Sequence, residues 1–380
     1  MEDENEFGSD RLLSLINYTK SSEKPNVHNS IFYYFSKMSS NPENEPTQHR
    51  TGRKRRRVKR TGGPNDPTQS GLKQVPRGYG ERKVLSEFPK VDCLTFGEVL
   101  GFGHFSHVYE GVYQGKYPAA IKIIERGSRR LVEKEIDLLT KLRDLPNIIQ
   151  LYEVIDLEET TLLVFERVKS IKPEEFYATV TLPKFRYVLK CLFTALRAAH
   201  EHNIVHRDVK LGNILISPDY KTVKLIDWGC SSMVKSKLSS KAGSRTCRSL
   251  EMLLGYDGYE TAGDMWAMGS FIYTVLCGGV LPWREPNSWQ TIVKLASYFG
   301  RRNTLELAAN LDCQVPEDVV EAIQNAVPTR LSANYDQEMK DLFDPDLIDL
   351  MHHLLTINYE VRYSAEDALC HPFFEEEEEE

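Results

Sequence analysis

Apolar residues change their spacing along the chain, and this change predicts a β-rich part followed by a helical part. Within 94–125, β-branched and apolar segments are broken by glycines, as in short strands joined by turns. Residues 131–142 have helical spacing, and 162–165 form a short apolar strand. After Asp208 the pattern is mainly helical. A long helix is predicted from apolar residues three and four apart: Phe185, Val188, Leu189, Leu192, Phe193, Leu196 and Ala199.

One long apolar run has two interpretations. Residues from Trp266 to Cys277, and the GGVLPW that follows, carry no charge before Arg284. The run contains Gly, Ser, Thr and Pro, and a membrane span needs about 20 predominantly apolar residues. We therefore expect a buried core helix and no membrane partner.

The first 75 residues differ in composition from the rest. They are rich in Ser, Asn, Pro and Glu and carry 13 Lys/Arg against nine Asp/Glu, whereas the whole chain has a net charge of −7. This composition predicts a disordered, flexible basic extension over 1–75, with a short amphipathic helix around 12–18.

A basic run within this extension has three interpretations. Such a run stays solvated, and an acidic receptor groove or phosphates can bind it. Nuclear import is favoured over a plain charged linker and over direct nucleic-acid binding, because no aromatic side chain interleaves for base stacking. Its charged members are Arg50, Arg53, Lys54, Arg55, Arg56, Arg57, Lys59 and Arg60.

The end of the chain and the cysteines limit the function classes. Six glutamates, 375–380, form an acidic tail that is either solvated or competes for the chain's own basic substrate groove. Seven scattered cysteines contain no CxxC pair, which argues against a zinc ribbon and a disulfide scaffold and favours reduced thiols. The acidic start MEDENEFGSD has no apolar segment, so we expect no secretory signal.

A glycine-rich hairpin is the first candidate for nucleotide chemistry. In LGFGHFSHVYEG, two glycines let backbone N–H groups approach phosphates. Ser106 stands where a third glycine would complete the GxGxxG motif, and Val108 would cover the purine of a nucleotide. Alone, the pattern is equally typical of a hairpin in any β domain. The candidate binding residues are Leu100, Gly101, Phe102, Gly103, His104, Phe105, Ser106, His107 and Val108.

A lysine at the end of an apolar strand is the second candidate. Lys122 closes AAIK, with Ala120 two positions before it, and Glu135 follows in the helical pattern VEKEIDLL. An ion pair between Lys122 and Glu135 would direct the ammonium group at phosphates. Glu133 is the competitor, but two positions away it would face another side of the helix.

Two further motifs supply groups for phosphoryl transfer. In HRDVKLGN, Asp208 can accept a hydroxyl proton, Lys210 can neutralise the transferred group, and Asn213 can bind Mg²⁺. In LIDWG, Asp227 follows an apolar strand and precedes a glycine, as in a metal-chelating turn. Carboxylate and amide oxygens suit Mg²⁺.

In this order the motifs resemble the eukaryotic protein kinase family over residues 94–374. The resemblance implies a bilobal α+β fold, with a small β-rich N-lobe over about 94–166 and a larger helical C-lobe over about 169–374. It implies ATP and Mg²⁺ as cofactors, and a hinge whose Glu166 and Val168 face the nucleotide. It also implies an anchor for the catalytic loop at Asp264 and an ion pair between Glu251 and Arg362.

Within that family the chain is most similar to catalytic alpha subunits of casein kinase II. The cues are VEKEIDLLTKLRDLPNIIQL, LLVFERV, Trp228 in LIDWG, and EMLLGYDGY followed by DMW. Residues 76–93 resemble the segment that packs on the kinase body in that family. The resemblance implies a serine/threonine kinase that is constitutively active, and a regulatory subunit that completes a heterotetramer.

The segment between Asp227 and Glu251 carries mostly basic charges. Lys241, Arg245 and Arg248 match positions that bind acidic residues after the target Ser or Thr in casein kinase II, so we predict protein substrates of that kind. The alternatives are that these charges hold the loop through internal contacts, or that loop phosphorylation at one of four hydroxyls controls activity: Ser239, Ser240, Ser244 and Thr246.

The chain departs from the casein kinase II pattern at several positions. Leu211 replaces a proline, Ser249–Glu251 replaces GPE, and Ala120 replaces a bulkier residue, so GTP use is not expected by default. Two other functions stay open: a replication-origin cell-division-cycle kinase that needs an activating subunit, and a pseudokinase scaffold. The basic extension together with the kinase resemblance predicts a nuclear and cytoplasmic location.

Overall fold

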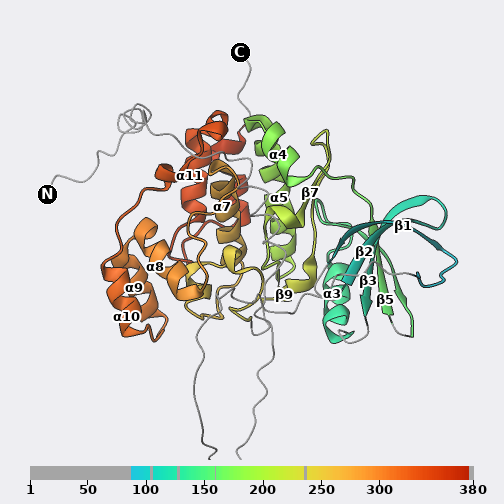
Figure 1. Cartoon of the computed structure of the whole chain (residues 1–380), viewed down its shortest axis with the longest axis horizontal. Coiled ribbons are helices and arrows are strands. Elements are labelled where there is room, and N and C mark those ends of the chain that lie inside the picture. The colour runs from blue at the N-terminus through green and yellow to red at the C-terminus, as the bar shows by residue number, and fades with distance from the viewer. Residues whose placement is uncertain (1–86, 103–105, 126–128, 159, 235–237, 376–380) are drawn as a thin grey trace, which may run out of the picture. The chain divides into compact units, whose positions relative to one another are not determined.

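The computed structural model describes residues 87–102, 106–125, 129–158, 160–234 and 238–375, which form two lobes (Figure 1). The smaller lobe is an antiparallel sheet in the order β1-β2-β3-β5-β4 with one helix, α3 (Arg129–Lys141). The predicted extension over 1–75 and its short helix lie outside the described residues, as do 76–86 of the segment predicted over 76–93 and all but Glu375 of the acidic tail predicted over 375–380. The strands are β1 (Leu94–Phe102), β2 (Ser106–Tyr113), β3 (Tyr117–Glu125), β4 (Leu151–Asp156) and β5 (Thr160–Glu166).

Alternating side chains give the sheet two buried faces. Tyr109 on β2 pairs with Ile121 on β3, which pairs with Val164 on β5, and the three form a small core with Leu94. Residues on the opposite face of the sheet, such as Ile124, pack instead into the large core that is shared with the C-lobe. This period of two is what the apolar segments between 94 and 125 predicted.

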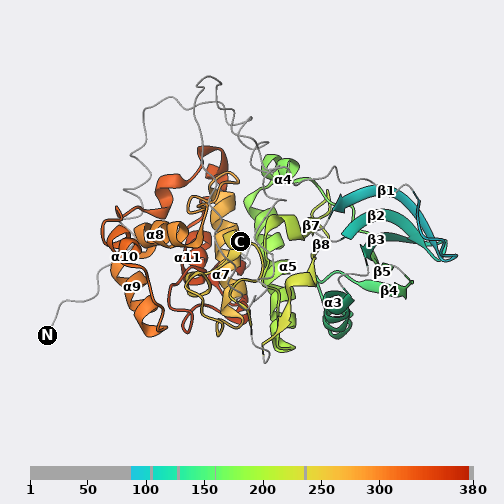
Figure 2. The ribbon, with the colours of Figure 1, turned by 60° about the horizontal axis from the view of Figure 1, so that its bottom comes forward.

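The larger lobe is mainly helical (Figures 1 and 2). The long helices α5 and α7 form its centre. Helix α7 is buried on nearly every side, as expected from the uncharged run that begins at Trp266, and Asp264 in its first turn is its one charged residue. Among the described residues, no helix has the length and apolar character to cross a membrane. The helices are α4 (Pro173–Thr179), α5 (Leu182–Glu201), α6 (Leu250–Leu253), α7 (Ala262–Leu276), α8 (Ser288–Phe299), α9 (Arg301–Asn310), α10 (Glu317–Gln324), α11 (Pro345–Leu354) and α12 (Ala365–Leu369).

Short strands lie on both sides of Asp208, although the sequence predicted mainly helix after it. The strands β7 (Ile214–Ile216) and β8 (Val223–Leu225) pair with each other, and β6 (Ile204–Val205) pairs with β9 (Ser232–Met233). Strands of two or three residues are too short to leave a periodic signal, so the apolar pattern could not reveal them.

The predicted ion pair between Glu251 and Arg362 is present and fully buried. Arg362 donates from Nη1 and Nη2 to the two carboxylate oxygens of Glu251 at 2.7 and 3.1 Å. It also donates to the carbonyls of Ala262 and Thr356, and its guanidinium lies over the ring of Trp266. The pair joins the start of α6 to α7 and to the segment before α12. Removing either partner would leave a buried charge without compensation.

Candidate active site

The predicted ion pair of the N-lobe is formed between β3 and α3. Lys122 Nζ lies 2.7 and 3.0 Å from the two carboxylate oxygens of Glu135. Glu133 is exposed, whereas Leu139, one turn after Glu135, is buried beneath the pair. Burial favours the neutral lysine, but the charges of Glu135 and Asp227 outweigh it and raise the pKa of Lys122. Lys122 is therefore a fixed cation between β3, α3 and the DWG turn, and this region between the two lobes is called the cleft below.

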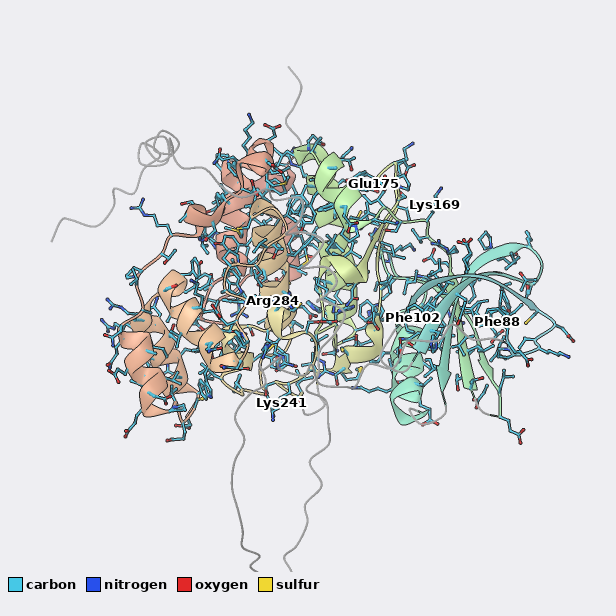
Figure 3. The ribbon with its side chains drawn as sticks, in the orientation of Figure 1. Phe88, Phe102, Lys169, Glu175, Lys241 and Arg284 are labelled. Atoms are coloured by element: carbon cyan, nitrogen blue, oxygen red, sulfur yellow. The ribbon has the colours of Figure 1, made fainter. Side chains whose placement is uncertain are left out.

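The described part of the glycine-rich hairpin lies above this cation. Gly101 pairs with Val108 and Phe102 with His107, while Gly103, His104 and Phe105 lie outside the described residues. A Cβ added at Gly101 would meet nothing within 4 Å among the described residues. Phe102 lies at the C-lobe side of the sheet in Figure 3.

Asp208 is buried, and three residues bind its carboxylate. Ser244 donates its backbone N–H to Oδ1 at 2.7 Å. Lys210 Nζ and Asn213 Nδ2 donate to Oδ2 at 2.7 and 3.0 Å. Burial raises the pKa of Asp208, but the charge of Lys210 and the hydrogen bonds from Lys210 and Ser244 outweigh burial, so the pKa lies below its ordinary value. The result is an ionised carboxylate in one fixed orientation.

The loop that carries Asp208 is attached to the C-lobe through Asp264 on α7. The backbone N–H groups of His206 and Arg207 each donate to Asp264 at 2.7 Å, and His200 Nε2 lies 3.0 Å from the same carboxylate. Arg207 has a φ of 69°, a conformation that a non-glycine residue adopts only when its surroundings impose it. Asp264 thus anchors the loop, as the family resemblance implied.

The DWG turn is joined to the same loop through His206. His206 Nδ1 accepts the N–H of Asp208 at 3.2 Å, and Nε2 lies 3.0 Å from the carbonyl of Ile226. An accepting Nδ1 requires the neutral ring with its proton on Nε2. The buried Trp228 packs edge-on against this ring at 4.7 Å and donates to the carbonyl of Leu225. Trp228, the residue after Asp227, is thus held in place by these two contacts.

Asp227 and Asn213 have the donor atoms that a divalent cation needs. Asp227 has φ and ψ of 62° and 70°, its side chain is half exposed, and its Oδ1 lies 3.8 Å from Lys122 Nζ. Asn213 uses Nδ2 to donate to Asp208, which leaves its Oδ1 without a protein donor among the described residues. A carboxylate and an amide oxygen at one edge of the cleft fit a hard cation.

The two predicted hinge residues, Glu166 and Val168, differ in which of their groups remain available to a nucleotide. The Glu166 side chain accepts the N–H of Gln150 at 2.9 Å and pairs with Lys224 at 2.8 Å, so its carboxylate supports the hinge. Only its backbone carbonyl remains for a nucleotide. The N–H of Val168 has no hydrogen-bond partner among the described residues, whereas its carbonyl accepts from Arg167.

Ser244 has a role in the site that the sequence analysis missed. Besides its N–H bond to Asp208, its Oγ lies 2.6 Å from Lys210 Nζ. The preceding Gly243 has a φ of 68°, and a Cβ there would lie 1.9 Å from the carbonyl oxygen of Arg207. Only glycine allows this approach. The turn-forming sequence AGSR was visible in the sequence. Nothing in the sequence showed that this turn contacts Asp208, 36 positions earlier.

The three predicted substrate-binding cations divide into two kinds. Arg248 donates to the backbone carbonyls of Lys241, Ala242 and Gly243, so it holds the loop from within. Arg245 is half-buried and has no side-chain partner among the described residues. Lys241 is exposed and projects from the lower edge of the C-lobe in Figure 3. Of the three, Lys241 and Arg245 have side-chain donors without a partner among the described residues, whereas Arg248 uses Nε and Nη2 within the loop.

A second group of potential metal ligands lies away from the cleft. Asp349 and His353 on α11 meet His371, whose Nε2 lies 3.1 Å from Asp349 Oδ2. His371 Nδ1 accepts the N–H of Phe373, so the proton of the neutral ring is on Nε2 and points at Asp349. A metal would need that nitrogen unprotonated. The arrangement therefore joins α11 to the end of the C-lobe as a hydrogen-bonded contact.

Replacing Lys210 by methionine should raise the pKa of Asp208. The substitution removes the charge and the hydrogen bond that now oppose burial, so the carboxylate will take up its proton at a higher pH than in the unmodified chain. A ¹³C NMR titration of the aspartate carboxyl groups, with the Asp208 signal assigned through Asp208→Asn, measures this. Lys210→Arg keeps the charge and should give a smaller rise. An unchanged pKa in Lys210→Met would contradict the role given to Lys210.

Comparison with known proteins agrees with this geometry. The family model described as protein kinase domain matches residues 94–374. Casein kinase II subunit alpha' of Saccharomyces cerevisiae is 24% identical over 313 residues, which cover 80% of this chain and 92% of the yeast protein. The matched residues include β1–β5, the loop that carries Asp208 and the DWG turn. The chain belongs to the protein kinase family.

Proposed function

We propose that this protein transfers the γ-phosphoryl group of ATP to serine or threonine hydroxyls of protein substrates, with Mg²⁺ as the metal. The observation that carries the proposal is the set of hydrogen bonds around Asp208. One carboxylate oxygen accepts from the Ser244 N–H and the other from Lys210 and Asn213, and the pKa is below its ordinary value. Such a carboxylate can orient an attacking hydroxyl and accept its proton.

The other residues of the cleft complete this chemistry. Lys122, held by Glu135, would bind phosphate oxygens of the nucleotide. Asp227 and Asn213 would hold the metal, which neutralises charge on the phosphates when it is bound. The free N–H of Val168 and the carbonyl of Glu166 would bind the base at the hinge. A pseudokinase scaffold would not need all of these groups in place, so their joint presence supports an enzyme.

The position of Lys210 supports a serine or threonine acceptor. Its ammonium group lies 2.7 Å from Asp208 and 2.6 Å from Ser244 Oγ, beside the carboxylate that would contact the hydroxyl. There it can neutralise the transferred phosphoryl group. The similarity to a yeast casein kinase II subunit supports the same specificity.

Contacts within the described part of the activation segment support activity without loop phosphorylation. Arg207 donates from Nε to the carbonyl of Cys230 at 2.6 Å, and Arg248 holds three carbonyls of the loop. Ser244 already binds Asp208 without any added phosphate. These bonds do for the loop what a phosphate does in kinases that are switched on by phosphorylation.

A preference for acidic residues after the target hydroxyl rests on Arg245 and Lys241. Lys241 is exposed, and Arg245 directly follows Ser244, whose N–H donates to Asp208. The described side chains offer Arg245 no carboxylate partner. A guanidinium group in that position favours Asp, Glu or phosphoserine on a substrate. A regulatory subunit and a nuclear and cytoplasmic location remain proposals, drawn from the relative's name and from the basic run.

The full chain should phosphorylate a peptide with Ser followed by Asp and Glu, and should act far less on the same peptide with Ser followed by Arg and Lys. The physical reason is the accessible charge of Arg245 and Lys241. Purified chain, ATP and Mg²⁺ are assayed without any partner, and Asp208→Asn is the control. Absence of transfer to both peptides would contradict constitutive activity and favour a kinase that depends on an activating subunit.

Arg245→Ala and Arg248→Ala should separate substrate recognition from loop support. Arg245→Ala should raise KM for the acidic peptide about fivefold to tenfold and leave a neutral peptide unchanged, because only a substrate charge is lost. Arg248→Ala should lower kcat for both peptides, since the loop that carries Ser244 loses three hydrogen bonds. Equal effects of the two substitutions on both peptides would contradict this division.

A further inference from the structure

A basic hollow lies on the C-lobe where α8 meets α9. It has a volume of about 480 Å³, and its lining includes Arg301, Arg302 and Arg330. No Asp or Glu is among the residues that line it. The volume is within the range of pockets that take a small ligand or a side chain. Figures 1 and 2 both place α9 at the end of the C-lobe away from the β1–β5 sheet, so the hollow is separate from the cleft.

The three arginines differ in how far their charges are already satisfied. Arg330 is exposed and its guanidinium has no partner among the described residues. Arg301 donates to the backbone carbonyl of Gln324 at 2.7 Å, a neutral acceptor that leaves its charge in place. Arg302 forms an ion pair with Glu306 at 2.6 Å. Two of the three positive charges therefore face the hollow without a carboxylate.

The backbone contributes partial charges of both signs here. Gly300 separates the end of α8 from the start of α9, and no side chain caps the first N–H groups of α9. Their partial positive charge lies beside the last carbonyls of α8, which carry the opposite partial charge, so the positive field of the hollow rests on the arginines. Beside the hollow, Val327 has 75% of its surface exposed and is followed by Pro328, which lines it. An apolar rim next to a basic hollow suits a polypeptide that contributes one anionic side chain.

We propose that this hollow binds a phosphorylated serine or threonine side chain of a protein partner, at a place distinct from the catalytic cleft. Planar guanidinium groups match phosphate oxygens in pairs, and a dianion gains more from two unpaired arginines than a single carboxylate does. The choice of phosphoserine or phosphothreonine among phosphate esters rests on the proposed function, because those groups are the products of that reaction. A substrate that already carries one phosphate would then be held while a second hydroxyl enters the cleft.

Binding is measured without ATP, so the result does not depend on phosphoryl transfer. The probe is a short fluorescent peptide of glycine, alanine and one phosphoserine, compared with its unphosphorylated form and with free phosphoserine. The unmodified full chain is measured first, and all further variants carry Arg245→Gln, because the acceptor-side arginine could bind the same phosphate. We expect the phosphopeptide to bind more tightly than either control.

Three substitutions in this background test the position of the site. Arg330→Gln should weaken phosphopeptide binding about fivefold to tenfold, and Glu306→Gln should tighten it because Arg302 is released from its ion pair. Arg143→Gln removes one exposed charge from the segment after α3 and should change nothing.

Three results of these binding measurements would overturn the proposal. Equal weakening by Arg330→Gln and Arg143→Gln would mean a general effect of charge. Loss of binding through Arg245→Gln alone would place the phosphate at the cleft. Equal affinity for free phosphoserine and for the phosphopeptide would exclude a protein partner as the selected ligand. If the phosphopeptide binds as expected but the chain transfers no phosphate, the hollow stands and the proposed function fails.

Discussion

The buried carboxylate of Asp264 is the constraint on which the catalytic arrangement depends. It accepts two consecutive backbone N–H groups, those of His206 and Arg207, at 2.7 Å each, and it has almost no exposed surface. If the buried carboxylate lost these donors, its desolvation would be uncompensated and would destabilise the fold. The two N–H groups are therefore firmly held. Arg207 consequently keeps a left-handed backbone conformation, and the next residue, Asp208, is directed into the cleft.

Several separate parts of the chain are aligned through this loop. His206 contacts the DWG turn through the carbonyl of Ile226 and the ring of Trp228, so it holds this turn in register with the loop. Gly243 lies directly against the carbonyl of Arg207, and that close approach brings Ser244 to Asp208. The N-lobe contributes Lys122, whose contacts with Glu135 and Asp227 join β3 and α3 to the same turn. Positioning of this kind supplies much of the rate acceleration in phosphoryl transfer.

The sequence predicted those features that leave a local or periodic pattern. The β-rich lobe, the buried helix α7 and the ion pair of Lys122 with Glu135 could be predicted from apolar spacing and from motifs. The contact of Ser244 with Asp208 could not, because it depends on a tight approach between segments 36 residues apart. The sequence also could not predict the inward orientation of Arg248, because a basic residue on a loop can bind either a substrate or the loop's own carbonyls. The hollow between α8 and α9 arises only when residues near 300 and 330 are brought together.

The central claim is that Asp264 positions Asp208 for catalysis without contacting the nucleotide or the substrate. It is tested most directly by measuring turnover and ATP affinity of the Asp264→Asn chain. The amide places N–H groups where a carboxylate oxygen now accepts, so the loop should shift. We predict that kcat falls about a hundredfold while the Kd for ATP changes less than about threefold. Turnover within about threefold of the unmodified chain, in a variant that still binds ATP, would contradict this account.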